Sequence, residues 1–172
     1  QHFATNPSRK DLAAVRQGEY EGLAERFQSG DLPDYGPKTY TSKVALHGAT
    51  AISVRPLMVA YNVNLEGGEL QNRLKAAKTI AGIIRERDGG MPGVRAIGWY
   101  LPDLNLVQVS CNLTKPHEAG VCEVFKIVQE LAKGLGFEVH SSELIGCIPQ
   151  SQFTTMTWKE LGFGQFKIFN NK

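Results

Sequence analysis

Five hydrogen-bonding side chains recur at every second position in two short segments of this sequence. They are Asn62, Asn64, Gln108, Ser110 and Asn112. Amides and hydroxyls do not titrate near neutral pH, so these residues can hold and orient a polar ligand but cannot shuttle protons. Their types and spacing therefore predict a positioning surface for a small polar ligand.

The two segments that carry these residues have the alternation of half-buried strands. In residues 57–65 the other positions are Leu57, Val59, Tyr61, Val63 and Leu65. In residues 106–113 they are Val107, Val109, Cys111 and Leu113. Successive strand side chains point to opposite faces, so we expect one apolar face and one polar face. An open antiparallel face is often polar without binding anything, and this interpretation stands beside the functional one.

The order of the predicted elements defines the fold class. In sequence, they are a strand over 57–65, a helix over 69–87, strands over 94–101 and 106–113, a helix over 117–135 and a strand-rich run over 137–148. This order is typical of the α+β, ferredoxin-like βαββαβ arrangement, a split βαβ unit. Right-handed crossovers put both helices on one face and the third strand beside the first. The five polar side chains should then be neighbours on the open face.

The remaining chain divides by composition. We expect residues 1–28 to be helical with a bend or break near Gly18 and Gly22, and 29–55 to form a long irregular connection. A loop of this length is typical of a ligand loop, with a plain linker as the alternative. Residues 56–150 form the ferredoxin-like unit. Residues 151–172 carry Trp158, Phe163, Phe166 and Phe169 and should pack on this domain or on a partner.

Composition narrows the functional classes. The net charge of +2 comes without a long basic run, which disfavours nucleic-acid binding. No segment has the pattern of a transmembrane helix or a secretory signal, and a cytoplasmic setting is expected. The three cysteines lack metal-type spacing, so no metal site is predicted. Cys111 and Cys147 lie in apolar runs and are predicted to be buried, reduced thiols.

Several separate motifs in the sequence are distinctive: Arg-Gln-Gly-Glu-Tyr-Glu at 16–21, Asp-Tyr-Gly-Pro at 34–37, Gly-Ala-Thr-Ala at 48–51, Val-Ala-Tyr-Asn-Val-Asn-Leu at 59–65, Ala-Ile-Gly-Trp-Tyr-Leu at 96–101 and Gln-Val-Ser-Cys-Asn-Leu at 108–113. Together they closely resemble the glutamate formiminotransferase family, including the transferase domain of formiminotransferase-cyclodeaminase. The likeness runs in register over about residues 8–149. It implies that this chain holds the end of a first ferredoxin-like half, the connecting segment and a whole second half.

The resemblance also implies an activity. Family members transfer a formimino group from N-formiminoglutamate to tetrahydrofolate, a step in histidine catabolism and one-carbon metabolism that uses no metal. By position in the family, the folate-binding residues are Gly36, Pro37, Lys38, Thr39, Tyr40 and Gly48. Between residues 37 and 47 the sequence and its spacing depart from the family pattern. The polar face over 62–64 and 108–112 is expected to position the substrate.

The reaction needs a proton shuttle, typically a histidine, and donors that hold two reactants together. The family's catalytic histidine lies in a His-x-Gly-Glu-His-Pro-Arg motif of the first half, which this sequence lacks. Its histidines are His2, His47, His117 and His140. We therefore assign no catalytic residue and expect another chain or segment to supply the missing first half. His47 is the candidate replacement base, although a surface loop histidine is the favoured interpretation.

Two other classes of function compete with this one. A non-catalytic ferredoxin-like subunit for ligand binding or assembly would keep the fold without the reaction. An RNA-binding domain of this fold would need stacking aromatic residues on the open sheet face, where the pattern places amides instead. The sequence leaves homo-oligomerisation open.

Overall fold

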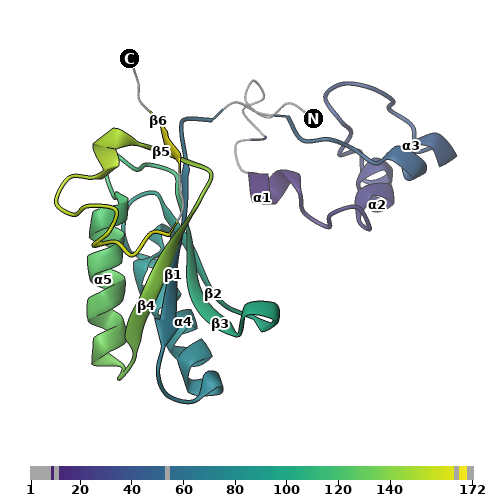
Figure 1. The fold of residues 1–172 in the computed structure, drawn as a ribbon. Helices are drawn as coiled ribbons and strands as arrows, with labels where there is room; N and C mark the ends of the chain where they lie inside the picture. Colours follow the sequence, from purple (N-terminus) through teal and green to yellow (C-terminus); the bar gives the residue numbers. More distant parts are fainter. Residues whose placement is uncertain (1–8, 10–11, 53–54, 165–166, 170–172) are drawn as a thin grey trace. The chain divides into compact units, whose positions relative to one another are not determined.

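The computed structural model describes residues 9, 12–52, 55–164 and 167–169. The chain divides into two units, Gln1–Arg55 and Pro56–Lys172 (Figure 1). Within the described ranges, no helix has the length and apolar character needed to span a membrane. The second unit contains the polar strands of interest.

A four-stranded antiparallel sheet forms the second unit. Its strands are β1 (Val59–Glu66), β2 (Val94–Leu101), β3 (Leu106–Leu113) and β4 (Glu138–Ile145). They lie in the order β2-β3-β1-β4, with every neighbouring pair antiparallel. Helices α4 (Leu70–Ile84) and α5 (Val121–Gly134) pack on one side of the sheet (Figure 1). The predicted ferredoxin-like α+β class is confirmed, and β3 lies beside β1 as expected.

Both long helices are shorter than predicted, for local reasons. Helix α4 ends at Ile84 because Arg85 adopts an extended conformation, and a 3₁₀ turn over Glu86–Asp88 follows. Helix α5 begins at Val121 rather than at 117. The Glu123 side chain accepts a hydrogen bond from the Gly120 backbone N–H at 3.2 Å, which fixes the first turn of the helix.

The core follows the predicted alternation. The side chains of β1 and β3 that are buried beneath the helices are Val59, Tyr61, Val63, Leu65, Val107, Val109, Cys111 and Leu113. Ile80 and Ile84 of α4 and Val128 of α5 meet them in one cluster. The even positions of β1 and β3 must then lie on the opposite side, which is called the open face below.

Strand β2 contacts α4 unusually closely. A Cβ atom built on Gly98 would lie 2.3 Å from the backbone nitrogen of Lys78 and 2.4 Å from the carbonyl carbon of Ala77. Real Cβ atoms do not approach other heavy atoms so closely. The helix backbone therefore rests directly on the strand, and residues 97 and 99 on either side of Gly98 lie on the open face.

The segment after β4 returns to the sheet. Leu161 is fully buried, and the ring of Phe163 contacts that of Tyr61 edge-on with centroids 5.6 Å apart. The Ser142 backbone N–H donates to the Gly162 carbonyl at 3.3 Å, so the segment runs along the outer edge of β4. Trp158 stays partly exposed.

Strands β5 (Cys147–Pro149) and β6 (Lys167–Phe169) pair in parallel. The side chains of residues 166 and 169, two of the four aromatic residues expected to pack, lie outside the described set.

Among its described residues, the first unit forms three short α-helices: α1 (Leu12–Val15), α2 (Leu23–Gln28) and α3 (Ser42–His47). The predicted break between the first two occurs where Gly18 has a φ of +76° and where a Cβ on Gly22 would lie 2.8 Å from the Gly18 Cα. The expectation of an irregular connection over 29–55 is wrong for part of its length, because α3 forms within it. The Thr41 hydroxyl accepts from the Val44 backbone N–H at 3.3 Å and caps this helix.

The cysteine prediction is half right. Cys111 is buried, and burial raises the pKa of its thiol to about 12. Cys147 is exposed, contrary to expectation. It opens the short strand β5, where alternation turns its neighbour Ile148 inward instead. Cys122, in the first turn of α5, is buried.

Thiol labelling should therefore separate the cysteines. With an aromatic disulfide reagent at mildly alkaline pH, we expect Cys147 to react at once, and Cys111 and Cys122 to react only as the protein unfolds, because reagent cannot reach a buried thiol. A Cys147→Ser variant should lose the rapid phase. Rapid reaction of a second thiol in the native protein would contradict the packing described here.

Candidate functional site

The strand register gathers the predicted polar residues on the open face. Asn62 of β1 is opposite Ser110 of β3, and Asn64 is opposite Gln108. Asn112 is opposite Ala60, one row further along. The residues separated by some 50 positions in the sequence thus form one surface.

A hydrogen-bonded network links one side chain from each strand. On β4, the Glu143 Oε2 atom accepts from Asn62 Nδ2 at 3.1 Å and from Gln108 Nε2 at 3.3 Å. On β2, the Trp99 Nε1–H group donates to Gln108 Oε1 at 3.1 Å. These four residues are called the open-face network. It crosses the whole sheet from edge to edge and fixes how the polar groups point.

The chemistry of the partners determines the orientation of Gln108. An indole N–H can only donate and a carboxylate can only accept, so the amide oxygen must face Trp99 and the amide nitrogen must face Glu143. Gln108 is only 2% exposed, which leaves its amide little freedom to turn. Asn62, 8% exposed, is held the same way by the carboxylate.

Asn64 belongs to a second, smaller pair beside the network. Its Nδ2 atom is 2.9 Å from Ser141 Oγ, while its Oδ1 atom is buried and has no hydrogen-bond partner among the described residues. The Ser141 hydroxyl can donate or accept, so Asn64 keeps one unpaired polar atom in either amide orientation. Ser110 is half-buried and Asn112 exposed, and neither makes a side-chain hydrogen bond to any residue in the described ranges.

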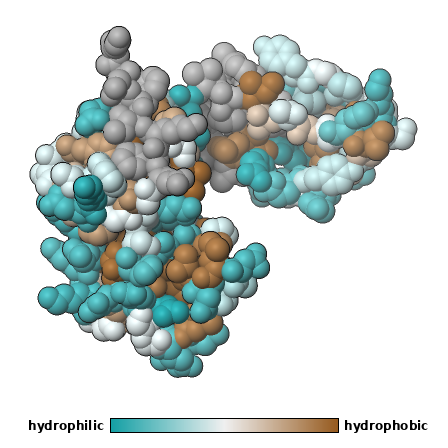
Figure 2. Space-filling model, in the orientation of Figure 1, coloured by the Kyte–Doolittle hydropathy of each residue, from teal (hydrophilic) through white to brown (hydrophobic). Residues whose placement is uncertain are grey.

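Sequence reasoning missed three members of this surface: Trp99, Ser141 and Glu143. Strand β2 has apolar residues on both faces, including exposed Ile97, so alternation alone could not show that Trp99 lies outward. Apolar side chains are visible over the β2–β3 region in Figure 2. The pairing of β1 with β4 shifts register between Asn64 and Leu65. This shift interrupts the alternation of side chains along β4, so alternation could not predict that Glu143 lies on the open face. Trp99 also puts an aromatic ring on the open face, where only amides were expected.

The predicted folate loop lies on the surface of the first unit. Gly36, Pro37, Lys38, Thr39 and Tyr40 are all exposed. The Lys38 ammonium donates to the backbone carbonyls of Pro33 and Asp34 and so stabilises its own turn. The ring of Tyr40 packs edge-on against Phe27 with centroids 5.6 Å apart.

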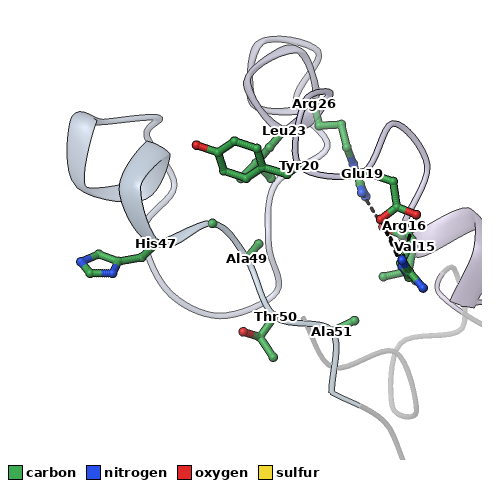
Figure 3. Close-up of a pocket in the computed structure, with 11 residues that line it drawn as sticks. Val15, Arg16, Glu19, Tyr20, Leu23, Arg26, His47, Ala49, Thr50 and Ala51 are labelled. Atoms are coloured by element: carbon green, nitrogen blue, oxygen red, sulfur yellow. Dashed lines mark hydrogen bonds and ion pairs between the residues drawn. The ribbon is translucent and has the colours of Figure 1, made fainter. Parts of the chain in front are cut away.

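A cavity of about 340 Å³ lies elsewhere in the same unit (Figure 3). Its walls include Arg16, Glu19 and Tyr20 from one of the sequence motifs and residues 48–51 from another. Arg16 and Glu19 form an exposed ion pair at 3.0 Å, and the Tyr20 hydroxyl donates to the Ala45 carbonyl. Gly48, with a φ of +68°, lies against the Tyr20 ring and is the member of the predicted folate set that lines this cavity.

The histidines do not join the network. His47 is one of the residues that line the cavity of the first unit, and in Figure 3 its imidazole points away from Tyr20. His140 Nδ1 lies 3.0 Å from Glu66 Oε2, and exposed His117 lies 3.5 Å from Glu118. His2 lies outside the described residues. Among the residues the structure describes, no group of three or more His, Cys, Asp or Glu side chains is arranged to hold a metal ion.

Comparison with known proteins adds a second line of evidence. The family model of the formiminotransferase domain matches residues 60–158, which include all four members of the network. Glutamate formimidoyltransferase of Thermoplasma acidophilum is 35% identical over 98% of this chain and 55% of its own length. The Streptococcus pyogenes serotype M1 protein of that name is 36% identical over 85% of this chain and 47% of its own length. Formimidoyltransferase-cyclodeaminase of Dictyostelium discoideum is 36% identical over 85% of this chain, which spans 27% of that protein.

Proposed function

Because the chain belongs to the formiminotransferase domain family, we propose that it is the folate- and substrate-positioning part of a glutamate formimidoyltransferase. The reaction would move a formimino group from N-formiminoglutamate to tetrahydrofolate. Relatives named glutamate formimidoyltransferase support the choice of substrate, and the chain spans about half of their length.

The open-face network is the observation that carries this proposal. Group transfer between two bound molecules depends on holding them in a reactive arrangement. Four side chains from four strands, locked by hydrogen bonds at 3.1–3.3 Å, form a rigid polar surface suited to that task. We assign substrate positioning to this surface, with Asn64, Ser110 and Asn112 beside it. Folate binding is assigned to Gly36–Tyr40 and Gly48.

We infer that the proton shuttle lies outside these 172 residues. The transfer proceeds through a tetrahedral adduct whose amine must gain and lose protons, a task for a group that titrates near neutral pH. The described histidines make no hydrogen bond to the network: His117 and His140 lie beside Glu118 and Glu66, and His47 belongs to the first unit. A histidine from a further segment or partner chain would complete the site.

Reconstitution tests the proposal. The chain would be mixed with a separately expressed N-terminal portion of the Thermoplasma acidophilum relative that carries the family's histidine motif. Formimino transfer to tetrahydrofolate would be followed by mass spectrometry. We expect activity from the mixture and none from either part alone, since each lacks groups that the other supplies.

The control is the same N-terminal portion with its motif histidines replaced by alanine, which should abolish transfer by the mixture. An inactive mixture of two associated, folded parts would instead favour the second candidate, a non-catalytic ligand-binding or assembly subunit. The absence of histidine from the described network is the observation in favour of that candidate.

A further inference from the structure

Several hydrogen-bond acceptors of the open face have no donor among the described residues. Both donors that reach Glu143 bind one oxygen, Oε2, and no donor in the described part of the chain reaches Oε1. Asn62 uses its amide nitrogen on that carboxylate, which leaves its oxygen without a donor from the described residues. Asn64, 5% exposed, adds one buried polar atom without a partner in those ranges. A buried polar atom without a partner costs free energy, so the Asn64 atom in particular marks a surface that lacks its complement.

The Glu143 carboxylate also lacks a cation. It takes part in none of the ion pairs found among the described residues. The open-face basic residue, Arg95, lies on β2 at the other edge of the sheet, in the row of Asn112 and Ala60. The exposed carboxylate therefore keeps an uncompensated negative charge on the β4 side of the polar surface.

We propose that Glu143 makes the open face a binding site for a planar N–C–N group that donates hydrogen bonds, such as an amidinium. The acceptors that the described residues leave free include Oε1 of Glu143 and the amide oxygen of the neighbouring Asn62, and two N–H groups on one carbon can donate to two such oxygens. The charge-assisted bond to the carboxylate is the stronger of the two. The identity of the natural ligand rests on the proposed function. Within that reaction, this chemistry occurs in the formimino group of one substrate and in the amino-pyrimidine edge of the pteridine in the other.

The same geometry argues against carboxylate binding at this surface. The amide groups of Asn62 and Gln108 that could have held a glutamate carboxylate each already donate one N–H to Glu143, which lies beside them. A carboxylate ligand would meet another carboxylate and be repelled. This reverses the simplest expectation for a row of amides, in which the ligand accepts and the protein donates.

A nearby flat surface could add affinity for an aromatic ligand. Trp99 is 43% exposed on the same face, and its ring is held in place by the bond from Nε1 to Gln108. Aromatic rings stack on such surfaces with a gain in affinity beyond that of simple burial. A pteridine would use this surface, whereas a formimino group is too small to need it.

Ligand titration of the 172-residue chain tests the inference without any assay of transfer. The side-chain N–H signals of Asn62, Gln108 and Trp99 would be followed by NMR on ¹⁵N-labelled protein at constant ionic strength. The probes are formamidinium, pterin, glutamate and tetramethylammonium, the last being a cation without N–H groups. We expect formamidinium or pterin to shift these signals and the other two to leave them unchanged.

Formamidinium and pterin distinguish the two possible ligands, the formimino group of one substrate and the pteridine of the other. Shifts with formamidinium alone identify the formimino group as the ligand, and shifts with pterin alone identify the pteridine edge. Shifts caused by glutamate, or no shift with any probe, would overturn the inference. Each of these results comes from the unmodified protein, so none depends on a variant that fails to fold.

A matched pair of variants locates the site. Glu143→Gln keeps an oxygen that can accept from both amides but removes the charge, and it should weaken probe binding about tenfold or more. Glu138→Gln removes the same charge from an exposed position on the same strand and should leave binding unchanged. Equal affinity of both variants would contradict the role of Glu143. Failed reconstitution with intact probe binding would refute only the proposed transferase function.

Discussion

A Gly98→Ala variant is expected to lose at least about 2 kcal/mol of its free energy of unfolding, or to fail to fold. The added methyl group would lie 2.3 Å from the Lys78 nitrogen and 2.4 Å from the Ala77 carbonyl carbon. Both atoms belong to the helix backbone and cannot swing aside as a side chain could. Helix α4 would have to move away from β2, opening the core along its length.

Gly82 provides the matched control. It lies inside α4, has an ordinary helical φ, and a Cβ atom added to it would meet no heavy atom within 4 Å. Gly82→Ala should raise stability by up to about 1 kcal/mol, because alanine favours the helix. Urea unfolding followed by tryptophan fluorescence would measure both variants, since Trp99 and Trp158 both lie in the second unit. Equal midpoints for Gly98→Ala and the parent would show that α4 does not rest on the strand.

Gln108→Ala in the complete or reconstituted enzyme should reduce kcat/KM for formimino transfer about 100-fold, a loss that a small displacement of a positioning group can produce. The substitution removes the acceptor of the Trp99 N–H group and one of the two donors that hold Glu143. Asn62→Ala, which removes the other donor, should have a comparable effect. Steady-state kinetics of formimino transfer would measure both variants.

The double variant distinguishes a network from independent contacts. If Asn62 and Gln108 both act through Glu143, the losses in transition-state free energy should not add, because the first substitution already frees the carboxylate. Gln129→Ala, an exposed glutamine on α5, is the control and should retain the parent activity. Circular dichroism would verify that each variant is folded. Parent-like kinetics for both single variants would show that the open face takes no part in the reaction.

The fold could be predicted from the sequence where one strand face is strictly apolar. On β1 and β3 every second residue is buried, and the period of two identified both strands and their shared polar face. Prediction failed where local hydrogen bonds decided the outcome. The Thr41 cap starts α3 inside a segment rich in Gly and Pro, and the Glu123 side chain starts α5 later than Pro116 had suggested.

The candidate site was predictable only in part, for a similar reason. Asn62 and Gln108 follow from the alternation of their own strands, whereas Glu143 depends on how β4 aligns with β1 across a register shift. The position of Trp99 depends on which face of β2 turns toward the helices, and both faces of this strand carry apolar residues. The contact of Gly98 with α4 decides between them. The centre of the network thus comes from long-range pairing that no local pattern encodes.

The position of β1 has a consequence for synthesis of the protein. This strand occupies the middle of the sheet, yet one of its partners, β4, begins only at residue 138, and Phe163 completes the packing around Tyr61 later still. A nascent chain that has emerged only as far as β3 exposes an unpaired edge of β1. Exposed edges of this kind can pair with strands of other chains. We therefore expect aggregation to compete with folding until the last strand has been released from the ribosome.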